Sequence, residues 1–354
     1  MKSTNSIYKK RIEAFQKTLK AHDVDACIIE KPIDLFYLTG LHLSLGTLFV
    51  HKKEALLCVD GRYIEAALEK SPVGAVLKKE ETIRSFLKKH KVLKLGFDGK
   101  FTSYENYLHF KKWRLAKPVS ISSPLEGLRL IKEKEEIEGL KKSAALLWLG
   151  FCHLQKHIKA GITEKELARI FEIFSLENGA EALAFEPIIA FGANSAMPHY
   201  RAGNTRLKKG DIVLIDIGVV LNTYHSDMTR VLFFGTPDPS LKKMYEVVKE
   251  SQKAALLKAK PGSDVREMDV AAREVMKKAG MENLFLHSLG HGIGLETHEH
   301  PRIKFDGPSL KLKRGMVITV EPGLYVSGLG GVRYEDTICI TETGYKNFFP
   351  KQEV

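Results

Sequence analysis

The sequence predicts an α+β protein in two domains, a smaller α/β domain over residues 1–122 and a larger one over residues 123–354. Its length of 354 residues exceeds what one hydrophobic core usually organises. Short apolar runs alternate with amphipathic stretches in the first third, whereas long helices and strands with short connections fill the rest, which favours antiparallel pairing there. A stretch that is rich in Ser and closed by Pro, residues 120–124, is typical of a linker.

The elements of the first domain follow from the spacing of its apolar residues. Residues 7–19 place them at helical intervals, which indicates an amphipathic helix. Lys52 and Lys53 separate two apolar runs that are typical of neighbouring strands. The strands expected in this domain are residues 25–29, 47–51, 54–60, 73–77 and 92–97, and the further helices are residues 63–68 and 83–87.

A long helical pattern over residues 128–158 opens the second domain and is stopped by Gly161. Thr163 and Glu166 then form the pattern of a capping box, in which the two side chains satisfy free backbone N–H groups at the start of a helix. Beyond residue 185 strands become frequent. The later strands expected are residues 212–220, 230–234, 316–320 and 337–341, and the later helices are residues 239–259 and 264–279.

The composition is that of a soluble globular protein, with 44% hydrophobic and 28% charged residues. The net charge is +12, but the excess of Lys is spread along the chain without a nucleic-acid-binding motif, which argues against nucleic acid as a partner. None of the four cysteines forms a CxxC pair, as expected for buried thiols in a reducing compartment. No signal sequence and no apolar run near the ~18 residues of a membrane span is present, so we expect a cytoplasmic protein with no membrane partner.

Two aspartates in one β-branched stretch give the first chemical signal. Asp216 lies inside an apolar run, where a carboxylate is costly unless it has a partner. A two-residue turn at Leu221 and Asn222 would fold this stretch into a hairpin in which Asp216 faces Asp227. Either aspartate alone is equally typical of a turn or a helix cap. Two carboxylates facing each other would repel unless a cation lay between them, so the pair predicts a divalent metal ion.

Three further side chains extend this signal. His291 lies between Gly290 and Gly292, which allow backbone to approach a ligand closely. Glu321 ends a strand before a Pro-Gly turn, and Glu335 precedes another strand. The nearby sequence Thr-His-Glu-His-Pro is not the HExxH zinc motif, because its spacing is wrong and its Pro would end the helix. Taken singly, each of the three is also compatible with a structural role.

Together the set comprises four carboxylates and one histidine, an oxygen-rich combination that suits hard or borderline divalent cations. Four carboxylates would over-neutralise one ion, so two ions about 3.5–4 Å apart fit the charge better. The expected ligands are Asp216, Asp227, His291, Glu321 and Glu335. The expected cofactors are two divalent metal ions, with Mn²⁺ preferred over Co²⁺ or Zn²⁺.

This pattern resembles the pita-bread metallopeptidases, which include aminopeptidase P, prolidase (Xaa-Pro dipeptidase) and methionine aminopeptidase. The resemblance covers residues 125–354 and all five ligand positions. Residues 35–40, Leu-Phe-Tyr-Leu-Thr-Gly, and the α/β pattern around them resemble the N-terminal domain of aminopeptidase P, prolidase and creatinase. The resemblance thus implies a pita-bread (creatinase/aminopeptidase-like) catalytic domain, a creatinase-type N-terminal domain and a homodimer. Creatinase itself uses no metal and lacks the full ligand set that is present here.

By this resemblance, Asp227 and Glu335 would bridge the two ions, Asp216 would bind one of them, and His291 with Glu321 would complete the other. A hydroxide bridging the ions would attack the carbonyl carbon of the scissile bond. Glu321 would pass the proton of that water to the leaving proline nitrogen.

Four more side chains match positions of the family. His199 and His298 would bind substrate and stabilise the tetrahedral intermediate, which with Glu321 makes them the expected catalytic groups. His287 and Arg333 would line the substrate site. The alternative for each of these four is a structural or surface role.

The expected activity is that of an Xaa-Pro aminopeptidase, the metal-dependent hydrolysis of the bond between an N-terminal residue and proline, as in aminopeptidase P. Prolidase activity on dipeptides is the alternative, because the sequence does not reveal what closes the far end of the cleft. The N-terminal domain argues against methionine aminopeptidase, and the intact ligand set argues against a non-catalytic binding protein on the same fold. Proline-containing peptides are the expected partners.

Overall fold

The computed structural model describes residues 4–350, which form two compact units. One unit ends at Arg129 and the second begins at Leu130. The domain boundary expected after residue 122 stays a prediction. Within residues 4–350, no helix is long and apolar enough to cross a membrane.

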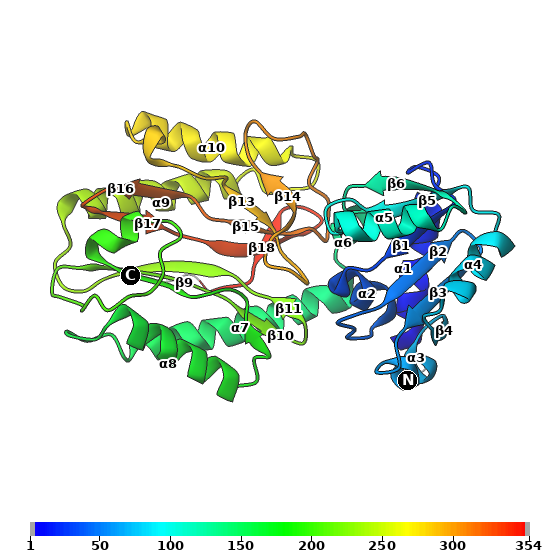
Figure 1. The fold of residues 1–354 in the computed structure, drawn as a ribbon. Helices are drawn as coiled ribbons and strands as arrows, with labels where there is room; N and C mark the ends of the chain where they lie inside the picture. The colour runs from blue at the N-terminus through cyan, green and yellow to red at the C-terminus, as the bar shows by residue number, and fades with distance from the viewer. Residues whose placement is uncertain (1–3, 351–354) are drawn as a thin grey trace. The chain divides into compact units, whose positions relative to one another are not determined.

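A six-stranded mixed sheet forms the centre of the first unit, in the order β4-β3-β2-β1-β5-β6 (Figure 1). β2 runs antiparallel to both of its neighbours, and the remaining pairs are parallel. The strands are β1 (Ala26–Ile29), β2 (Thr47–His51), β3 (Glu54–Val59), β4 (Gly74–Leu77), β5 (Lys94–Asp98) and β6 (Lys117–Ile121). The helices are α1 (Thr4–Thr18), α2 (Pro32–Thr39), α3 (Ile64–Lys70), α4 (Glu80–Lys89), α5 (Tyr104–Lys112) and α6 (Glu126–Arg129).

The expected strands of this unit are confirmed within one or two residues at their ends. The prediction of a linker over residues 120–124 is wrong at its start, because Ser120 and Ile121 belong to β6 and pair in parallel with β5. The sequence signal failed here because Pro118 lies inside β6. This strand lies at the edge of the sheet, which is where a strand tolerates Pro.

In the described part of the second unit, residues 130–350, every strand pairing is antiparallel, as expected. Its sheets are β12-β9-β8, β11-β10-β7, β14-β13-β15-β18-β19 and β16-β17. The first two contain β7 (Ala182–Leu183), β8 (Ile188–Phe191), β9 (Ile212–Ile217), β10 (Val219–Leu221), β11 (Tyr224–His225) and β12 (Met228–Phe233). The others contain β13 (Gly290–Gly292), β14 (Glu299–Ile303), β15 (Val317–Val320), β16 (Gly323–Val326), β17 (Gly330–Arg333), β18 (Asp336–Ile340) and β19 (Tyr345–Asn347).

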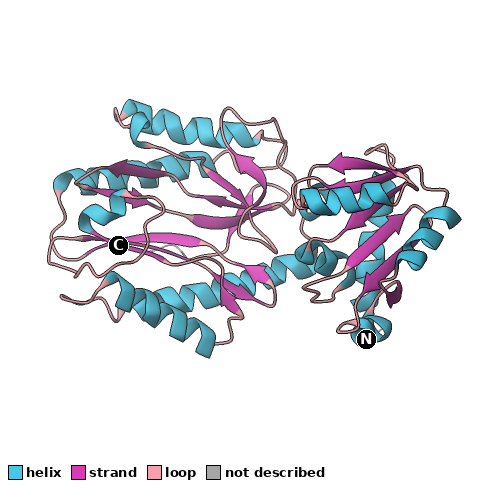
Figure 2. Cartoon of the chain, viewed as in Figure 1, coloured by secondary structure: helices cyan, strands magenta, loops and turns pink. Residues whose placement is uncertain are grey.

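Four long helices cover these strands, two on each side, as Figure 2 shows within this unit. They are α7 (Lys134–Gln155), α8 (Glu164–Glu177), α9 (Pro239–Leu256) and α10 (Val265–Lys278). Two short 3₁₀ turns, η1 (Gly192–Ala196) and η2 (Glu282–Leu284), complete the elements. The helix expected over residues 128–158 is shorter than predicted, because Lys132 donates its backbone N–H to Gly315 and the chain is not helical there. The capping box of Thr163 and Glu166 is confirmed.

The two faces of β9 belong to two different cores. Val213 and Ile215 pack in the core that includes residues of α7 and α8. Ile212 and Leu214 pack in the core that includes residues of α9 and α10. Since side chains of a strand alternate between its faces, Asp216 shares the face of Ile212 and Leu214. Burial of both faces explains why this strand has a continuous apolar run.

The register predicted for the aspartate hairpin is wrong by two residues. The turn residues are Asn222 and Thr223, both with positive φ (49° and 69°), and Thr229 rather than Asp227 lies opposite Asp216. Positive φ at both central positions is the geometry of a type I′ turn, which Asn favours. A shift of two residues preserves the face, so Asp227 becomes the diagonal neighbour of Asp216 on the same side.

Candidate metal centre

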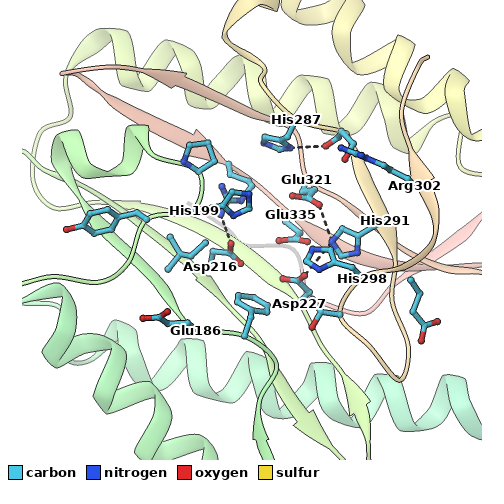
Figure 3. A pocket seen from close by; sticks show the side chains of 18 of the residues that line it. Glu186, His199, Asp216, Asp227, His287, His291, His298, Arg302, Glu321 and Glu335 are labelled. Carbon is cyan, nitrogen blue, oxygen red and sulfur yellow. Dashed lines mark hydrogen bonds and ion pairs between the residues drawn. The ribbon is translucent and has the colours of Figure 1, made fainter. Parts of the chain in front are cut away.

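A pocket of about 610 Å³ opens in the second unit, and polar side chains crowd its floor (Figure 3). It contains every site residue expected from the sequence: Asp216, Asp227, His291, Glu321, Glu335, His199, His287, His298 and Arg333. Strand ends supply the five expected ligands. The two aspartates come from the β9–β12 hairpin, and the histidine and two glutamates come from β13 and the ends of β15 and β17. Segments far apart in the sequence therefore converge on one cluster.

His291 presents one ring nitrogen to this cluster. Its Nδ1 lies 3.0 Å from the carbonyl oxygen of Gly292 and donates to it, which directs Nε2 at the carboxylates. Nε2 lies 3.3 Å from Glu321 Oε1 and 3.7 Å from Asp227 Oδ2. A histidine whose Nδ1 donates to a backbone carbonyl binds a metal ion through Nε2 once that nitrogen has lost its proton.

Arg333 and Thr229 bind the carboxylates from the other side. The Arg333 guanidinium donates to Asp216 Oδ2 and, over 3.0 Å, to Thr229 Oγ1. Thr229 in turn donates to Glu335 Oε2 over 2.8 Å. Within the described residues, the other oxygens, Asp216 Oδ1 and Glu335 Oε1, are buried without a hydrogen-bond partner. Two buried, unsatisfied carboxylate oxygens in one pocket indicate that something else binds them.

The electrostatics of the cluster point the same way. Burial, together with the neighbouring carboxylates, raises the pKa of Asp227 and of Glu335 well above the usual range. Burial also raises the pKa of Asp216, although Arg333 opposes the shift. Burial acts in the same direction on Glu321, but the hydrogen bond from His291 and the electrostatic effects of His291 and Arg333 together outweigh it and lower the pKa of Glu321. The positive charge near the four carboxylates is thus too small to keep all of them ionised. A bound cation would supply the missing charge.

The donor set fits divalent metal ions. Asp227, His291 and Glu335 each offer a ligand atom, and these atoms lie within 4.8 Å of one another. Asp216 and Glu321 lie outside this tightest group, but each adjoins it, through the unsatisfied Oδ1 of Asp216 and the contact of Glu321 with His291. Oxygen donors with one imidazole suit hard and borderline ions.

The expected substrate-site residues differ in how many of their polar atoms are already hydrogen-bonded within the protein. His287 donates from Nδ1 to the Ser288 carbonyl (2.8 Å) and accepts the Tyr325 hydroxyl at Nε2 (2.9 Å). Burial lowers the pKa of His287, so the ring is neutral and already bonded at both nitrogens. Burial also lowers the pKa of His298, whose ring centroid lies 4.3 Å from that of His291. His199 lines the same pocket.

One cation in the pocket wall escaped the sequence analysis. Arg302 on β14 lies directly opposite His291 in the strand register, so its side chain shares that face. Figure 3 draws it among the side chains that line the pocket. Its position in the strand after the His-rich stretch was the only available signal, and an isolated Arg is normally a surface residue.

A buried ion pair beside the pocket was also missed. Lys132 Nζ donates to Glu299 Oε2 over 3.1 Å, and both side chains are almost fully buried. Glu299 Oε1 accepts the backbone N–H groups of Leu295 (2.9 Å) and Glu296 (3.2 Å). Glu299 therefore shapes the loop that carries His298.

Both units of the chain are similar to known proteins. The sequence model of metallopeptidase family M24 matches residues 138–342, and that of the creatinase/prolidase N-terminal domain matches residues 11–131. The chain is 41% identical over 341 residues to the Xaa-Pro dipeptidase of Pyrococcus furiosus, covering 96% of this chain and 97% of the relative. Among solved structures, it resembles an Xaa-Pro dipeptidase from Bacillus anthracis (33% identity, TM-score 0.94, 98% and 99% covered). It also resembles an X-Pro aminopeptidase from Thermotoga maritima MSB8 (30% identity, TM-score 0.86, 95% and 99% covered).

Proposed function

Because the chain belongs to metallopeptidase family M24 and carries a creatinase/prolidase-type N-terminal domain, we propose that it is an Xaa-Pro dipeptidase. Relatives named Xaa-Pro dipeptidase or prolidase favour this alternative over the aminopeptidase P-like activity that the sequence analysis put first. The two-domain organisation still argues against methionine aminopeptidase. A cytoplasmic homodimer, implied by the cysteine usage and by the family resemblance, completes the proposal.

The observation that carries the dipeptidase assignment is Arg302. It is directed to the same face as His291, and we find no hydrogen bond or ion pair for it within residues 4–350. The other pocket arginines are engaged, Arg201 with Glu186 at 3.2 Å and Arg333 with Asp216. A dipeptide carries a free carboxylate one residue after the scissile bond, whereas a longer peptide has an amide there. A guanidinium without a partner at this place favours the carboxylate.

The remaining roles follow the chemistry of the pocket. Asp216, Asp227, His291, Glu321 and Glu335 would hold two divalent ions, with Mn²⁺ as the proposed metal. Bound divalent cations make a hydroxide nucleophile available near neutral pH. Glu321, whose pKa is lowered in this pocket, is the carboxylate that can accept a proton.

Glu321 would then return that proton to the proline nitrogen, which has no N–H of its own. His199 and His298 would donate hydrogen bonds to the oxygen on which negative charge develops. His287, through Tyr325, and Arg333, through Asp216, would keep the pocket walls in place.

Replacing Arg302 by alanine should raise KM for Gly-Pro about 10- to 100-fold while kcat changes little. Loss of a charge-assisted hydrogen bond of about 1.5–3 kcal/mol accounts for this range. The matched control is Arg201→Ala, which removes an arginine of the same pocket that is already paired. Equal losses in both variants, or no loss in either, would refute the role of Arg302.

The choice between the two activities rests on protein stripped with a chelator and then supplied with Mn²⁺, Co²⁺ or Zn²⁺. We expect metal-dependent cleavage of Gly-Pro, weak cleavage of Arg-Pro-Pro and none of Met-Ala-Ser. Equally efficient cleavage of Arg-Pro-Pro would restore the aminopeptidase P assignment. Cleavage of Met-Ala-Ser alone would establish a methionine aminopeptidase.

A further inference from the structure

We propose that Glu164 is a positioning residue that holds the loop carrying His199 over the metal centre. The proposal rests on the proposed function in one respect, namely that His199 contacts the substrate. Glu164 is the first residue of α8, and its side chain is completely buried (0% exposed). A buried carboxylate is costly unless it is fully hydrogen-bonded, so its presence calls for an explanation.

Four hydrogen bonds join this carboxylate to one loop. Oε1 accepts from the backbone N–H of Phe191 (2.8 Å) and from Asn194 Nδ2 (2.9 Å). Oε2 accepts from the hydroxyl of Tyr200 (2.8 Å) and from the backbone N–H of Gly203 (3.1 Å). These donors lie on both sides of His199 in the sequence, and together they use the acceptor capacity of the carboxylate. The Glu164 carboxylate therefore binds both ends of the segment formed by residues 191–203.

The ends of the same loop are tied down by other bonds. Lys165 donates its backbone N–H to the carbonyl of Gly203 over 2.9 Å, and Glu164 donates its own to Thr205 over 3.2 Å. Near the other end, Ser195 Oγ accepts the backbone N–H of Gly331 over 2.8 Å, which links η1 to the strand that carries Arg333. His199 lies between these anchors, and its neighbour Tyr200 reaches Glu164 directly.

Capping of α8 does not explain Glu164. The capping box of this helix is complete without it, since Thr163 and Glu166 satisfy each other's backbone N–H groups. Glu166 is exposed, and among residues 4–350 its side chain bonds only within this first turn. The two glutamates thus have different roles: Glu166 caps the helix, whereas Glu164 holds the loop that carries His199.

The test uses Glu164→Gln, with Glu166→Gln as the matched control. An amide at position 164 retains one acceptor oxygen but replaces the other with a donor, so at least one backbone N–H loses its partner. Hydrogen exchange measured by mass spectrometry should rise in residues 191–205 of Glu164→Gln and stay unchanged in Glu166→Gln. This readout needs no substrate.

Activity then shows whether Glu164 acts through His199. We expect kcat/KM for Gly-Pro to fall on the order of 10²-fold in Glu164→Gln, the effect of displacing a reacting group by about 1 Å. In a His199→Ala background the same substitution should change kcat/KM less than about threefold, whereas in a His298→Ala background it should retain its full effect. Metal content should equal that of the wild type in every variant.

Two results would overturn the proposal: unchanged exchange in residues 191–205, or an equal loss of activity in the His199→Ala and His298→Ala backgrounds. A wild-type protein that cleaves no Xaa-Pro peptide would refute the proposed function instead. Exchange in Glu164→Gln, compared with Glu166→Gln, would then decide alone whether Glu164 holds the loop.

Discussion

Replacing Asp227 by asparagine is expected to abolish metal-dependent hydrolysis and, at the same time, to stabilise the metal-free protein. Asp227 is buried among Glu335, Asp216 and Glu321, which together with burial raise its pKa well above the usual range. Loss of this ligand should weaken metal binding by more than the roughly 10- to 100-fold that removal of an outer hydrogen bond to a ligand costs. Without metal, the neutral amide relieves both repulsion and desolvation of charge. The gain should be on the order of 1 kcal/mol, since one unit of pKa shift corresponds to about 1.4 kcal/mol.

Metal binding is measured as the metal content of the purified protein, and activity as Gly-Pro hydrolysis. Calorimetry in the presence of a chelator measures the stability of the metal-free protein. Asp306→Asn is the control, since Asp306 is exposed, pairs with Lys304 and lies outside the pocket. We expect the control to keep its metal and its activity. An Asp227→Asn protein that binds metal normally, or that is less stable than wild type when stripped, would contradict the assignment of Asp227 as a ligand in a repulsive cluster.

Replacing Lys132 by methionine is expected to cost about 3–5 kcal/mol of stability, the usual cost of removing one partner of a buried ion pair. Their ion pair measures 3.1 Å, and only 2% and 5% of the two side chains are exposed. Such a loss is a large part of the roughly 5–15 kcal/mol by which domains are stable. Activity should fall as well, since Glu299 holds the backbone of Leu295 and Glu296 ahead of His298.

A double variant separates the charge from the packing. Lys132→Met combined with Glu299→Gln removes both charges, so most of the lost stability should return. Unfolding in urea, followed through Trp148 in a Trp113→Phe background, reports on the second unit alone, because Trp148 lies in α7. Lys304→Met, which breaks an exposed pair, should cost less than about 1 kcal/mol. Equal losses for Lys132→Met and Lys304→Met would show that burial does not strengthen the pair.

The face of the aspartate hairpin was predictable from the sequence, but its register was not. Because side chains of a strand alternate between its two faces, Asp216 shares a face with Ile212 and Leu214 in any register. The exact turn depends on two residues, Asn222 and Thr223, adopting positive φ, and the sequence offered Leu221 and Asn222 as a comparable pair. The error moved the pairing by two residues. Because side chains alternate with a period of two, the aspartates remained on one face and the predicted cluster survived.

The residues that escaped prediction are charged groups whose partners are distant in the sequence. Lys132 and Glu299 are 167 residues apart, and the Glu164 side chain bonds residues up to 39 positions away. Charged side chains are normally exposed, so nothing local marks these as buried. Only the fold brings their partners together. The expected metal ligands, by contrast, were marked in the sequence because carboxylates inside apolar strands are costly, and their binding of metal stays a prediction.

The long sequence separation across the metal centre has a kinetic consequence. The hydrogen bond from Thr229 to Glu335 closes a span of 106 residues, and the pair of Arg333 with Asp216 closes 117. Contacts between residues so distant in the sequence form only after the chain has lost much conformational entropy. We therefore expect them to be absent from the transition state for folding. Metal ions bound there should therefore slow unfolding in proportion to their affinity and leave the folding rate unchanged. The metal would then stabilise the native protein kinetically, by slowing its unfolding, without helping it to fold.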